Sequence, residues 1–441
     1  VGAGHARDGI LRAHLNNHPL GKTSHDGAPD RMRVLFVHQN FPGQFKHLAP
    51  WLISQGHQVV GMGDAENLGA RAQGFGFPVV AYKGRKEGSA STHHYLRSFE
   101  GAVRRGQDAA RACMDLRAKG FVPDLVIGHP AWGEMLFVRD VFPDARLVPY
   151  FEFFYRAVGA DVGFDPEYPS TLDTGFKLRI RNSTQLHALS EADAGISPTA
   201  WQRSTYPERE KPRIHVIHEG LDLDVVRPDP AARFRLPDGR VLGPDEQVVT
   251  FVSRQLEPYR GFHVFMRALP ELQRRLPRAQ FVIVGSDGVS YGTPPPKPHA
   301  CYREMLLAEV GPQLDAARTH FVGRLAYGDY LALMQLSRLH IYLSYPFVLS
   351  WSMLEAMACG APVLGSATPP VQEMIRDGEN GWLFDFFDRE ALVAKAVEIL
   401  ASDTQAVRAA ARAMVESRFS FREHSLPAYL ALIRELLPGA A

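Results

Sequence analysis

The sequence predicts an α/β protein whose two doubly wound domains face each other across a cleft. Short apolar segments alternate with helical stretches in two successive series, which is typical of parallel sheets covered by helices on both faces. A polar, proline-rich stretch over residues 222–245 separates the two series, and 441 residues suffice for two domains of ordinary size. Because such folds bind ligands at the carboxyl ends of their strands, we expect the functional site between the domains.

The first series begins with a buried strand over residues 34–37, Val-Leu-Phe-Val. A turn over 38–44 follows, then a helix over 45–54 that Gly56 ends and a strand that starts at Gln58. Further strands are predicted over 79–82, 125–127, 147–150, 194–197 and 214–217.

The second series has apolar strands over residues 248–252, 281–284, 320–322, 340–343 and 362–365. Helices are predicted between them over 262–276, 302–309, 327–337 and 352–358, and the chain ends in helical stretches over 389–401, 404–418 and 422–437. The expected plan is a flexible extension over 1–31, a Rossmann-like domain over 32–220, a linker over 221–247, a second Rossmann-like domain over 248–418, and a helix over 419–441 that packs back on the first domain.

Composition excludes several classes of protein. A net charge of +1 gives no reason to expect a nucleic-acid partner. Three widely spaced cysteines argue against a disulfide framework and for a reducing, cytoplasmic compartment. No apolar run approaches the ~20 residues of a membrane span. Histidines near the start of the chain fit no tight metal site, so no metal is expected.

The stretch 97–119 is rich in arginine and suits peripheral contact with an anionic membrane surface at the inner face. A solvated helix face is the alternative, because Glu100, Asp108 and Asp115 interrupt the basic residues.

Residues 350–364 are the most informative stretch, because they predict a short helix that Gly360 ends and an apolar strand directly after it. The free N–H groups at the start of a helix bind anions well. Glu355, one turn into the helix, is placed to accept two hydroxyl hydrogens from a ribose, so the pair of features predicts a nucleotide site. Ser352 and Glu355 also have the spacing of a capping box, which is the structural alternative.

Three other segments are expected at the same site. Arg254 and Arg260 follow the strand over 248–252, where guanidinium groups would bind a diphosphate; a surface ion pair with Glu257 is the alternative. The glycine-rich loop that begins at Ser286 and the turn at Gly323 and Leu325 are weaker candidates for contacts with a phosphate and a base.

Segments of the second half carry a resemblance to a known family. Arg254 to Phe262, Leu354 to Val363 and Asp377 to Phe384 resemble the donor half of a retaining family-4 glycosyltransferase with the GT-B fold. Arg33 to Phe45 is similar to the acceptor half of bacterial members, and the likeness covers nearly everything from Met32 onward.

The resemblance implies roles for individual residues. Arg254 and Arg260 would hold the diphosphate, Glu355 the ribose, and His129 would lie beside the transferred sugar. The remaining donor-binding candidates are Gly43, Gln44, Ser286, Gly323, Leu325, Val348, Leu349 and Ser350. Tyr150 and Glu152 are the acceptor-side candidates, with core packing as the alternative for the aromatic run 150–155.

One position departs from the family pattern. The first glutamate of the family's pair should stand eight residues before Glu355, where this chain has Phe347, which cannot accept a hydrogen bond. Backbone groups of residues 348–350 would then hold the sugar, or catalysis is lost. Glu373 matches another frequent carboxylate of the family, or it is an ordinary residue of a first helical turn.

The resulting expectation is a metal-independent, retaining glycosyltransferase without a cofactor, which moves a hexose-like sugar from a nucleoside-diphosphate donor, with UDP favoured, to a hydroxyl acceptor. That acceptor is a glycan, a lipid-linked molecule or a small molecule. The alternatives are a nucleotide-sugar-binding protein that has lost activity, for which Phe347 is the reason, and a sugar-nucleotide epimerase on the same frame.

Overall fold

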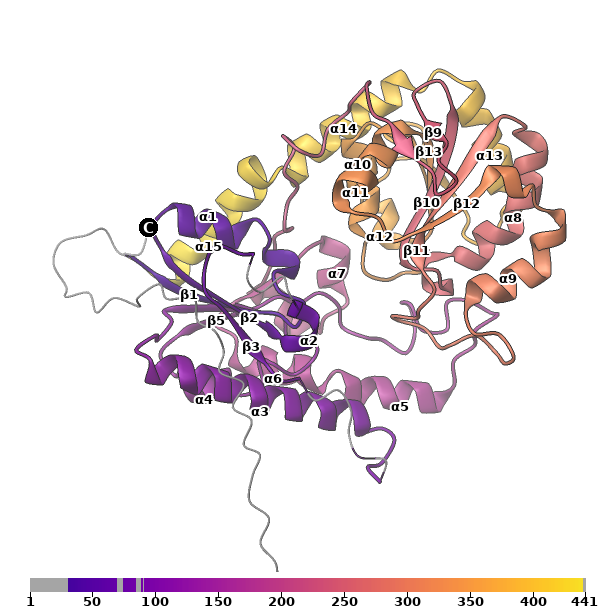
Figure 1. Cartoon of the computed structure of the whole chain (residues 1–441). Helices are drawn as coiled ribbons and strands as arrows, with labels where there is room; N and C mark the ends of the chain where they lie inside the picture. Colours follow the sequence, from indigo (N-terminus) through magenta and orange to yellow (C-terminus); the bar gives the residue numbers. More distant parts are fainter. Residues whose placement is uncertain (1–30, 70–73, 85–88, 90, 439–441) are drawn as a thin grey trace, which may run out of the picture.

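The computed structural model describes residues 31–69, 74–84, 89 and 91–438, and it has two parallel sheets, each with helices on its faces (Figure 1). The predicted fold class is therefore confirmed. The expected N-terminal extension lies, up to residue 30, outside the described residues.

The sheet of the first domain has the strand order β3-β2-β1-β4-β5. Its central strand is the predicted one at residues 34–37: Val34 pairs with Val59 on one side and with Leu125 on the other. The strands are β1 (Arg33–Val37), β2 (Gln58–Asp64), β3 (Val79–Tyr82), β4 (Leu125–Gly128) and β5 (Arg146–Pro149). A bridge between Tyr150 and Ile196 extends this sheet to the parallel pair β6 (Gly195–Ser197) and β7 (Ile214–Val216).

Helices of the first domain follow the strands as predicted, with one difference at the start. The expected helix over 45–54 is divided into a 3-10 turn, η1 (Gly43–Phe45), and α1 (Leu48–Ser54). The others are α2 (Ala65–Leu68), α3 (Arg97–Ala118), α4 (Val138–Val141), α5 (Leu172–Arg181), α6 (Ser183–Glu191), α7 (Ala200–Ser204) and the 3-10 helix η3 (Glu208–Arg213).

The sheet of the second domain has the order β12-β11-β10-β13-β14-β15. Its strands are β10 (Gln247–Gln255), β11 (Ala279–Ser286), β12 (Thr319–Gly323), β13 (Ser337–Tyr342), β14 (Val363–Ser366) and β15 (Trp382–Phe384). The edge strand β15 was not predicted, because three residues are too short a run to show periodicity.

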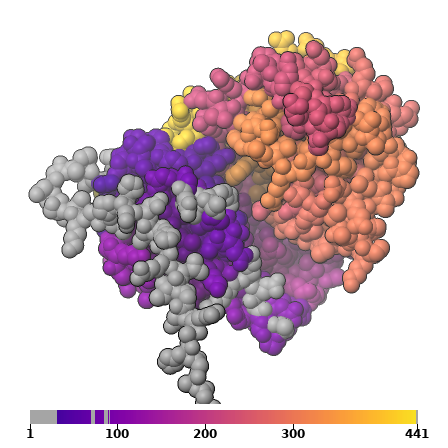
Figure 2. Space-filling model, in the orientation of Figure 1, coloured from indigo at the N-terminus to yellow at the C-terminus, as the bar shows by residue number. Residues whose placement is uncertain are grey.

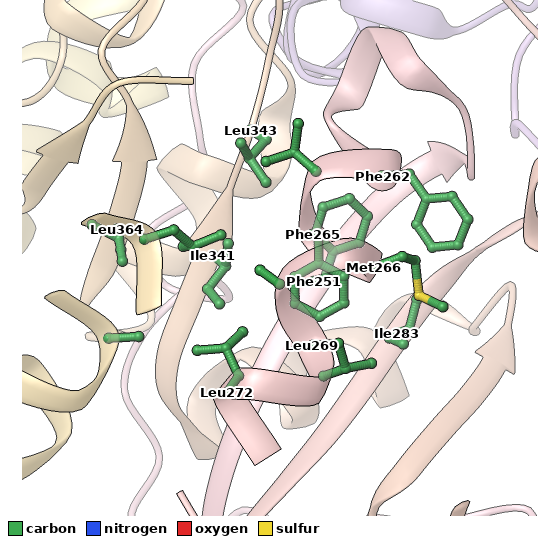
Figure 3. Packing of buried hydrophobic residues seen from close by; sticks show 14 of the residues in the cluster. Phe251, Phe262, Phe265, Met266, Leu269, Leu272, Ile283, Ile341, Leu343 and Leu364 are labelled. Carbon is green, nitrogen blue, oxygen red and sulfur yellow. The ribbon is translucent and has the colours of Figure 1, made fainter. Parts of the chain in front are cut away.

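The helices that cover this sheet are α8 (Phe262–Arg275), α9 (Tyr302–Val310), α10 (Tyr327–Leu336), α11 (Trp351–Ala358), α12 (Pro369–Gln372), α13 (Arg389–Ala401) and α14 (Gln405–Phe419). Short 3-10 turns lie at η4 (Pro258–Arg260), η5 (Gly311–Gln313) and η6 (Ala316–Arg318). Figure 3 shows the core between α8 and the sheet, where the rings of Phe251 and Phe265 stack with centroids 4.6 Å apart.

The segment predicted as a linker is part of the second domain. It forms a two-stranded hairpin, β8 (Phe234–Arg235) and β9 (Val241–Leu242). Phe234, Leu236 and Leu242 are buried in the second domain's core beside α10, so the proline-rich composition marked a packed hairpin rather than a free connection.

The two domains are joined by the C-terminal helices as well as by the hairpin segment. After α14 the chain passes through a π-helical turn, η7 (Phe421–Ser425), and α15 (Leu426–Leu436) lies beside α1 of the first domain (Figure 1). Leu426, Tyr429 and Ile433 are buried with Val34 and Phe36. Figure 2 shows the first domain, in indigo and purple, beside the orange second domain.

A loop of the first domain contributes to the core of the second. Phe153 and Ala160, which follow β5, are buried among the second domain's apolar residues. The carboxylate of Asp165 in the same loop accepts hydrogen bonds from the Tyr345 hydroxyl at 2.6 Å and from His263 Nε2 at 2.9 Å. The two domains therefore share a packed junction at the carboxyl ends of their strands.

Candidate active site

Helix α11 presents its N-terminus at the domain junction. Ser350 is the N-cap, and its side chain accepts the N–H of Ser352 at 3.4 Å. Its own N–H donates to the Tyr342 hydroxyl at 2.8 Å. Trp351, the first residue of the helix, donates its indole N–H to Glu219 of the first domain. The start of the helix is thus held in place from both domains.

Glu355 does not form the capping box that its spacing allows. Its side chain is buried at 5% exposure, and its two oxygens accept the hydroxyls of Tyr327 at 2.9 Å and Tyr330 at 2.8 Å. The capping-box alternative is therefore wrong. Each carboxylate oxygen can accept a second hydrogen bond, so the group remains able to bind hydroxyls.

Arg260 binds the loop that leads into α11. Arg260 is buried at 7% exposure, and its guanidinium donates to Ser344 Oγ at 2.9 Å and to the carbonyl of Val348 at 2.7 Å. Val348 and Ser350 are half-buried beside it, and Leu349 is buried in the core of the second domain. An arginine and a helix N-terminus, predicted separately from the sequence, are therefore neighbours.

Arg254 has a different environment. It is exposed at the end of β10 and, within the described part of the chain, makes no hydrogen bond or ion pair. Besides burial and His129, which have larger effects, the charge of Arg254 contributes to lowering the pKa of His38 in the first domain. Arg254 is thus a cation at the junction that is available to an anionic ligand.

Glu257 does not pair with either arginine, so the alternative of a surface ion pair is wrong. The carboxylate is buried at 1% exposure and accepts three backbone N–H groups, from Ser290 at 3.0 Å, Tyr291 at 3.2 Å and Gly292 at 3.0 Å. It therefore fixes the glycine-rich loop after β11. Ser286 begins this loop, and its carbonyl accepts the N–H of Leu256 at 2.8 Å.

The turn after β12 has the form expected for a strand-to-helix connection. Gly323 has a φ of +65°, a conformation that favours glycine, and is half-buried. The side chain of Leu325 is half-buried against the core of the second domain. Both residues lie on the strand-end side of the sheet, as predicted.

Phe347 occupies an aromatic cluster formed by both domains. Its ring is 2% exposed and lies edge-on to Tyr291 at 4.7 Å, to Phe153 at 4.8 Å and to Tyr259 at 5.4 Å. The Arg260 guanidinium lies 5.8 Å from its centroid. Hydrophobic packing across the junction therefore takes the place of the expected carboxylate.

In the first domain, the candidates Gly43, Gln44, His129 and Glu152 come together. Gln44 Nε2 donates to Glu152 Oε1 at 3.0 Å, and His129 Nε2 lies 3.3 Å from Glu152 Oε2. Gly43 has a φ of +49°, and a Cβ there would lie 2.6 Å from His38 Nε2. Only glycine therefore lets this loop pack on the His38 ring.

Sequence reasoning missed His38 and Trp132. His38 follows β1 and is buried; burial and the neighbouring His129 lower its pKa well below the usual range. The Trp132 ring stacks on His129 with centroids 4.1 Å apart. His38 could have been predicted from the sequence, because it directly follows a strand, as His129 does, and that position led us to choose His129.

Tyr150 is buried beneath the junction rather than open to it, which argues against its predicted place as an acceptor-side residue. Its side chain is 0% exposed, and its hydroxyl donates to Glu219 at 2.8 Å. Tyr150 therefore packs in the core of the first domain, which was the alternative for this aromatic run. Glu152, two residues on, is half-buried and contacts Gln44 and His129.

Glu373 is neither a free carboxylate nor a residue that caps its own helix. Its two oxygens accept the N–H groups of Ala200 at 2.9 Å and Trp201 at 2.8 Å, the first residues of α7 in the other domain. A carboxylate at a helix N-terminus is favourable for the helix dipole. Glu373 is therefore a contact between the domains.

The expectation of an anionic-membrane face on α3 finds no support. Arg104 and Arg111 pair with Glu100 and Asp108 on the same helix, and Arg117 donates to the carbonyl of Val141 at 3.1 Å. In the described chain, no helix combines the length and hydrophobicity that crossing a bilayer requires. Over the same residues, no three His, Cys, Asp or Glu side chains gather as metal ligands would.

Two family models match this chain. Residues 55–226 match the one described as "Glycosyl transferase family 4 group", and residues 238–415 match "Glycosyl transferases group 1". The two matches lie one on each domain, and the second contains Arg254, Arg260 and Glu355.

Curated relatives carry names of the same kind. The D-inositol 3-phosphate glycosyltransferase of Mycobacterium avium strain 104 is 29% identical over 262 residues, which are 58% of this chain and 58% of the relative. The GDP-mannose-dependent alpha-(1-6)-phosphatidylinositol monomannoside mannosyltransferase of Mycolicibacterium smegmatis is 28% identical over 261 residues, 57% of this chain and 63% of the relative. The chain thus spans less than two thirds of the length of these relatives.

Solved structures share the fold. Sucrose-phosphate synthase from Thermosynechococcus elongatus superimposes with a TM-score of 0.67 at 16% identity, covering 92% of this chain and 100% of that one. Anabaena HepE in complex with UDP-glucose gives a TM-score of 0.60 at 18% identity, covering 91% and 99%. At these identities the likeness shows the two-domain arrangement alone.

Proposed function

Because this chain belongs to the family-4 glycosyltransferases of the GT-B fold, we propose that it transfers a hexose-like sugar from a nucleoside-diphosphate donor to a hydroxyl acceptor with retention of configuration. The observation that carries this proposal is the contact between Arg260 and the carbonyl of Val348, directly before the N-terminus of α11. That contact brings a fixed guanidinium and the positive end of a helix to one place, an arrangement suited to a diphosphate.

The proposed reaction needs little covalent chemistry from the protein. The bond between the anomeric carbon and the phosphate oxygen breaks, and the acceptor hydroxyl attacks from the face that the nucleotide leaves. A phosphate oxygen of the leaving diphosphate takes the acceptor's proton. Arg254, Arg260 and the start of α11 would stabilise the charge that develops on the diphosphate, without a metal ion. Such preorganised donors are commonly the largest catalytic contribution of an enzyme.

Substitution of the arginines tests this role. Arg254→Ala should lower turnover by ~100-fold or more, on the scale of losing one transition-state donor, with little effect on folding because Arg254 is exposed. Arg260→Ala should do the same, and because Arg260 is buried, thermal unfolding of this variant shows whether it is folded. Steady-state donor consumption is the measurement, and Arg275→Ala, an exposed change on α8, is the matched control. Near-normal kinetics in both variants would remove the arginines from the mechanism.

The donor's nucleobase is proposed as uracil, with guanine as the alternative. HepE is named with UDP-glucose and the Mycolicibacterium relative with GDP-mannose, so relatives of this chain carry both bases in their names. Thermal-shift measurements with UDP, GDP, ADP and their sugar conjugates identify the nucleobase, since a ligand at 100 times its Kd stabilises the protein by ~2.7 kcal/mol.

The acceptors to test first follow from the relatives' names, and they are inositol phosphates and phosphatidylinositol glycolipids.

Three outcomes separate the proposed function from its rivals. Slow donor hydrolysis that accelerates with an acceptor supports the transferase, and unchanged rates in EDTA support metal independence. Tight binding of a nucleotide sugar without turnover favours the binding protein that Phe347 suggests. Conversion of the donor to an epimer, with no acceptor present, favours the epimerase.

A further inference from the structure

We propose that Glu152 binds the hydroxyl groups of the transferred sugar and so replaces the carboxylate that Phe347 removes. This inference rests on the proposed function, and it moves sugar recognition from the second domain to the first. The residues concerned are His38, Gln44, His129 and Glu152, with Trp132 beside them; we call them the hydroxyl cluster.

The carboxylate of Glu152 is oriented and still has room for a ligand. Nδ1 of His129 accepts the N–H of Ala131 at 3.3 Å, so Nε2 carries the hydrogen and donates to Glu152 Oε2. Gln44 donates to the other oxygen. Each oxygen therefore has one protein donor and can accept another hydrogen bond, and 27% of the side chain is exposed.

The hydroxyl cluster contains polar atoms that lack partners. Among the described residues, His38 Nε2 and Gln44 Oε1 are buried and make no well-formed hydrogen bond, although the Gln44 side chain lies close enough to His38 to counter part of the lowering of its pKa that burial causes. His38 Nδ1 accepts the N–H of Asn40 at 2.9 Å, so Nε2 is a donor, while Gln44 Oε1 is an acceptor. A sugar hydroxyl both donates and accepts, so it suits such a pair of atoms.

The indole ring of Trp132 adds an apolar surface to the hydroxyl cluster. Trp132 is half-buried, stacked on His129 and edge-on to His38 with centroids 5.2 Å apart. Carboxylate, amide, imidazole and indole together offer both the hydrogen bonds and the flat apolar surface that a sugar ring requires.

Two contacts favour the donor's sugar over the acceptor. After burial and His129, Arg254, a diphosphate candidate, is one of the groups that lower the pKa of His38, which is consistent with a diphosphate bound near the hydroxyl cluster. Phe153, the residue after Glu152, packs on Phe347 with centroids 4.8 Å apart. The neighbour of Glu152 in the sequence therefore contacts the position at which the family's carboxylate was expected.

Calorimetric titration of Glu152→Gln tests the inference, with UDP, GDP, UDP-glucose and GDP-mannose as probes. The variant should bind the preferred sugar nucleotide at least tenfold more weakly and its free nucleotide within twofold of the unmodified protein. With UDP-galactose and GDP-glucose titrated for comparison, the variant should also lose discrimination between UDP-glucose and UDP-galactose, or between GDP-mannose and GDP-glucose, which a merely structural role would not affect.

Glu191→Gln is the matched control, because Glu191 is an exposed carboxylate of the first domain that lies 3.8 Å from Arg139. Glu152→Asp, which keeps the charge, should recover part of the lost affinity. Thermal unfolding of each ligand-free variant shows whether it is folded.

Four results would overturn the inference. Equal losses for nucleotide and sugar nucleotide would make Glu152 a structural residue. An unchanged donor affinity with a raised acceptor KM would assign the hydroxyl cluster to the acceptor. Unchanged affinities throughout would remove Glu152 from the site but leave the proposed function intact. An unmodified protein that binds none of the four probes would contradict the proposed function as well.

Discussion

Phe347 joins the two domains through its ring, and this contact explains a hydrophobic residue at the position where the resemblance led us to expect a carboxylate. The ring touches Phe153 from the first domain and Tyr259 and Tyr291 from the second. Each such aromatic pair adds about 0.5–1.5 kcal/mol beyond the burial of area. Loss of a hydrogen-bonding side chain is thus offset by a more apolar junction.

Phe347→Glu should therefore destabilise the protein rather than improve catalysis. Removing the buried ring costs ~3–5 kcal/mol, and a buried carboxylate without a partner adds to the loss. The expected result is a large fall in the free energy of unfolding, measured by urea titration, with no rise in turnover. Phe347→Leu, which stays apolar, should lose less stability. A stable and faster Phe347→Glu enzyme would show that this space is available to a carboxylate.

Spacing in the sequence located individual site residues better than it located their partners. Arg260 and Glu355 were predicted at one end of the second domain, and the structure places them there, because strand ends and helix starts converge in doubly wound folds. The two tyrosines on Glu355 were not, since they come from α10, and no pattern along the chain connects residues 25 and 28 positions apart. Tyr150 was misassigned because alternation along a strand does not show which face is covered.

At the scale of elements, the contact between α12 and α7 fixes the orientation of the domains. Helix α7 has five residues, too few to be stable alone, and its first N–H groups are bound by Glu373 of the other domain. The side chain of the N-cap residue Thr199 accepts a further hydrogen bond, from the N–H of Gln202 in the same domain. The helix is therefore stabilised partly by the neighbouring domain.

Glu373→Gln should weaken this contact, since it removes the charge and one of the two acceptors. The expected loss is about 1–2 kcal/mol, typical of a removed helix cap. Hydrogen exchange at Ala200 and Trp201 should become about tenfold faster, because 1.4 kcal/mol is one factor of ten in an opening equilibrium. Glu379→Gln, an exposed change six residues along, is the control. Unchanged exchange in Glu373→Gln would mean that α7 is stable without the second domain.

Most elements were predictable from periodicity, and the exceptions have physical causes. Helix α13 begins and ends at the predicted residues, because its apolar residues recur with helical spacing and Asp388 caps its N-terminus. The hairpin β8–β9 was read as a linker, since two-residue strands between prolines give no alternation to detect. Its apolar residues pack on α10, a contact that only the folded chain creates.

At the scale of the whole molecule, the junction is lined by buried and half-buried carboxylates that accept hydrogen bonds across it. The Glu219 carboxylate accepts the indole N–H of Trp351. In the same way, Asp165 binds Nε2 of His263, and Glu373 accepts the backbone N–H of Ala200. Near Glu219, His218 lies 3.7 Å from the carboxylate, and the Lys46 ammonium stands over the Trp351 ring at 4.3 Å. The relative position of the domains therefore depends on ionisable groups.

Acid should destabilise the protein through its buried histidines. Burial, with a smaller effect of Lys46, lowers the pKa of His47 from 6.5 to about 4, and burial also lowers the pKa of His38 and His218. The unfolded chain binds protons first as the pH falls below 6.5, so this stability is present above pH 6.5 and is lost down to about pH 4.

His47→Gln should reduce that dependence. Between pH 7 and 5 the fall in the free energy of unfolding should be about 1 kcal/mol smaller in the variant, after allowance for the partial exposure of His47. Urea titrations at the two pH values measure it, with His187→Gln, whose ring stacks on Phe99, as the control. Equal falls in the unmodified protein and His47→Gln would show that this histidine is not involved.

Trp351 gives the protein an optical probe at its domain junction. Its indole N–H is bound by Glu219, its ring lies beneath an ammonium group, and 38% of the residue is exposed. Any movement of α11 away from the first domain would release the indole to water and shift its emission. Arrival of a nucleotide could then be followed in real time by fluorescence, without a label, against a Trp351→Phe background.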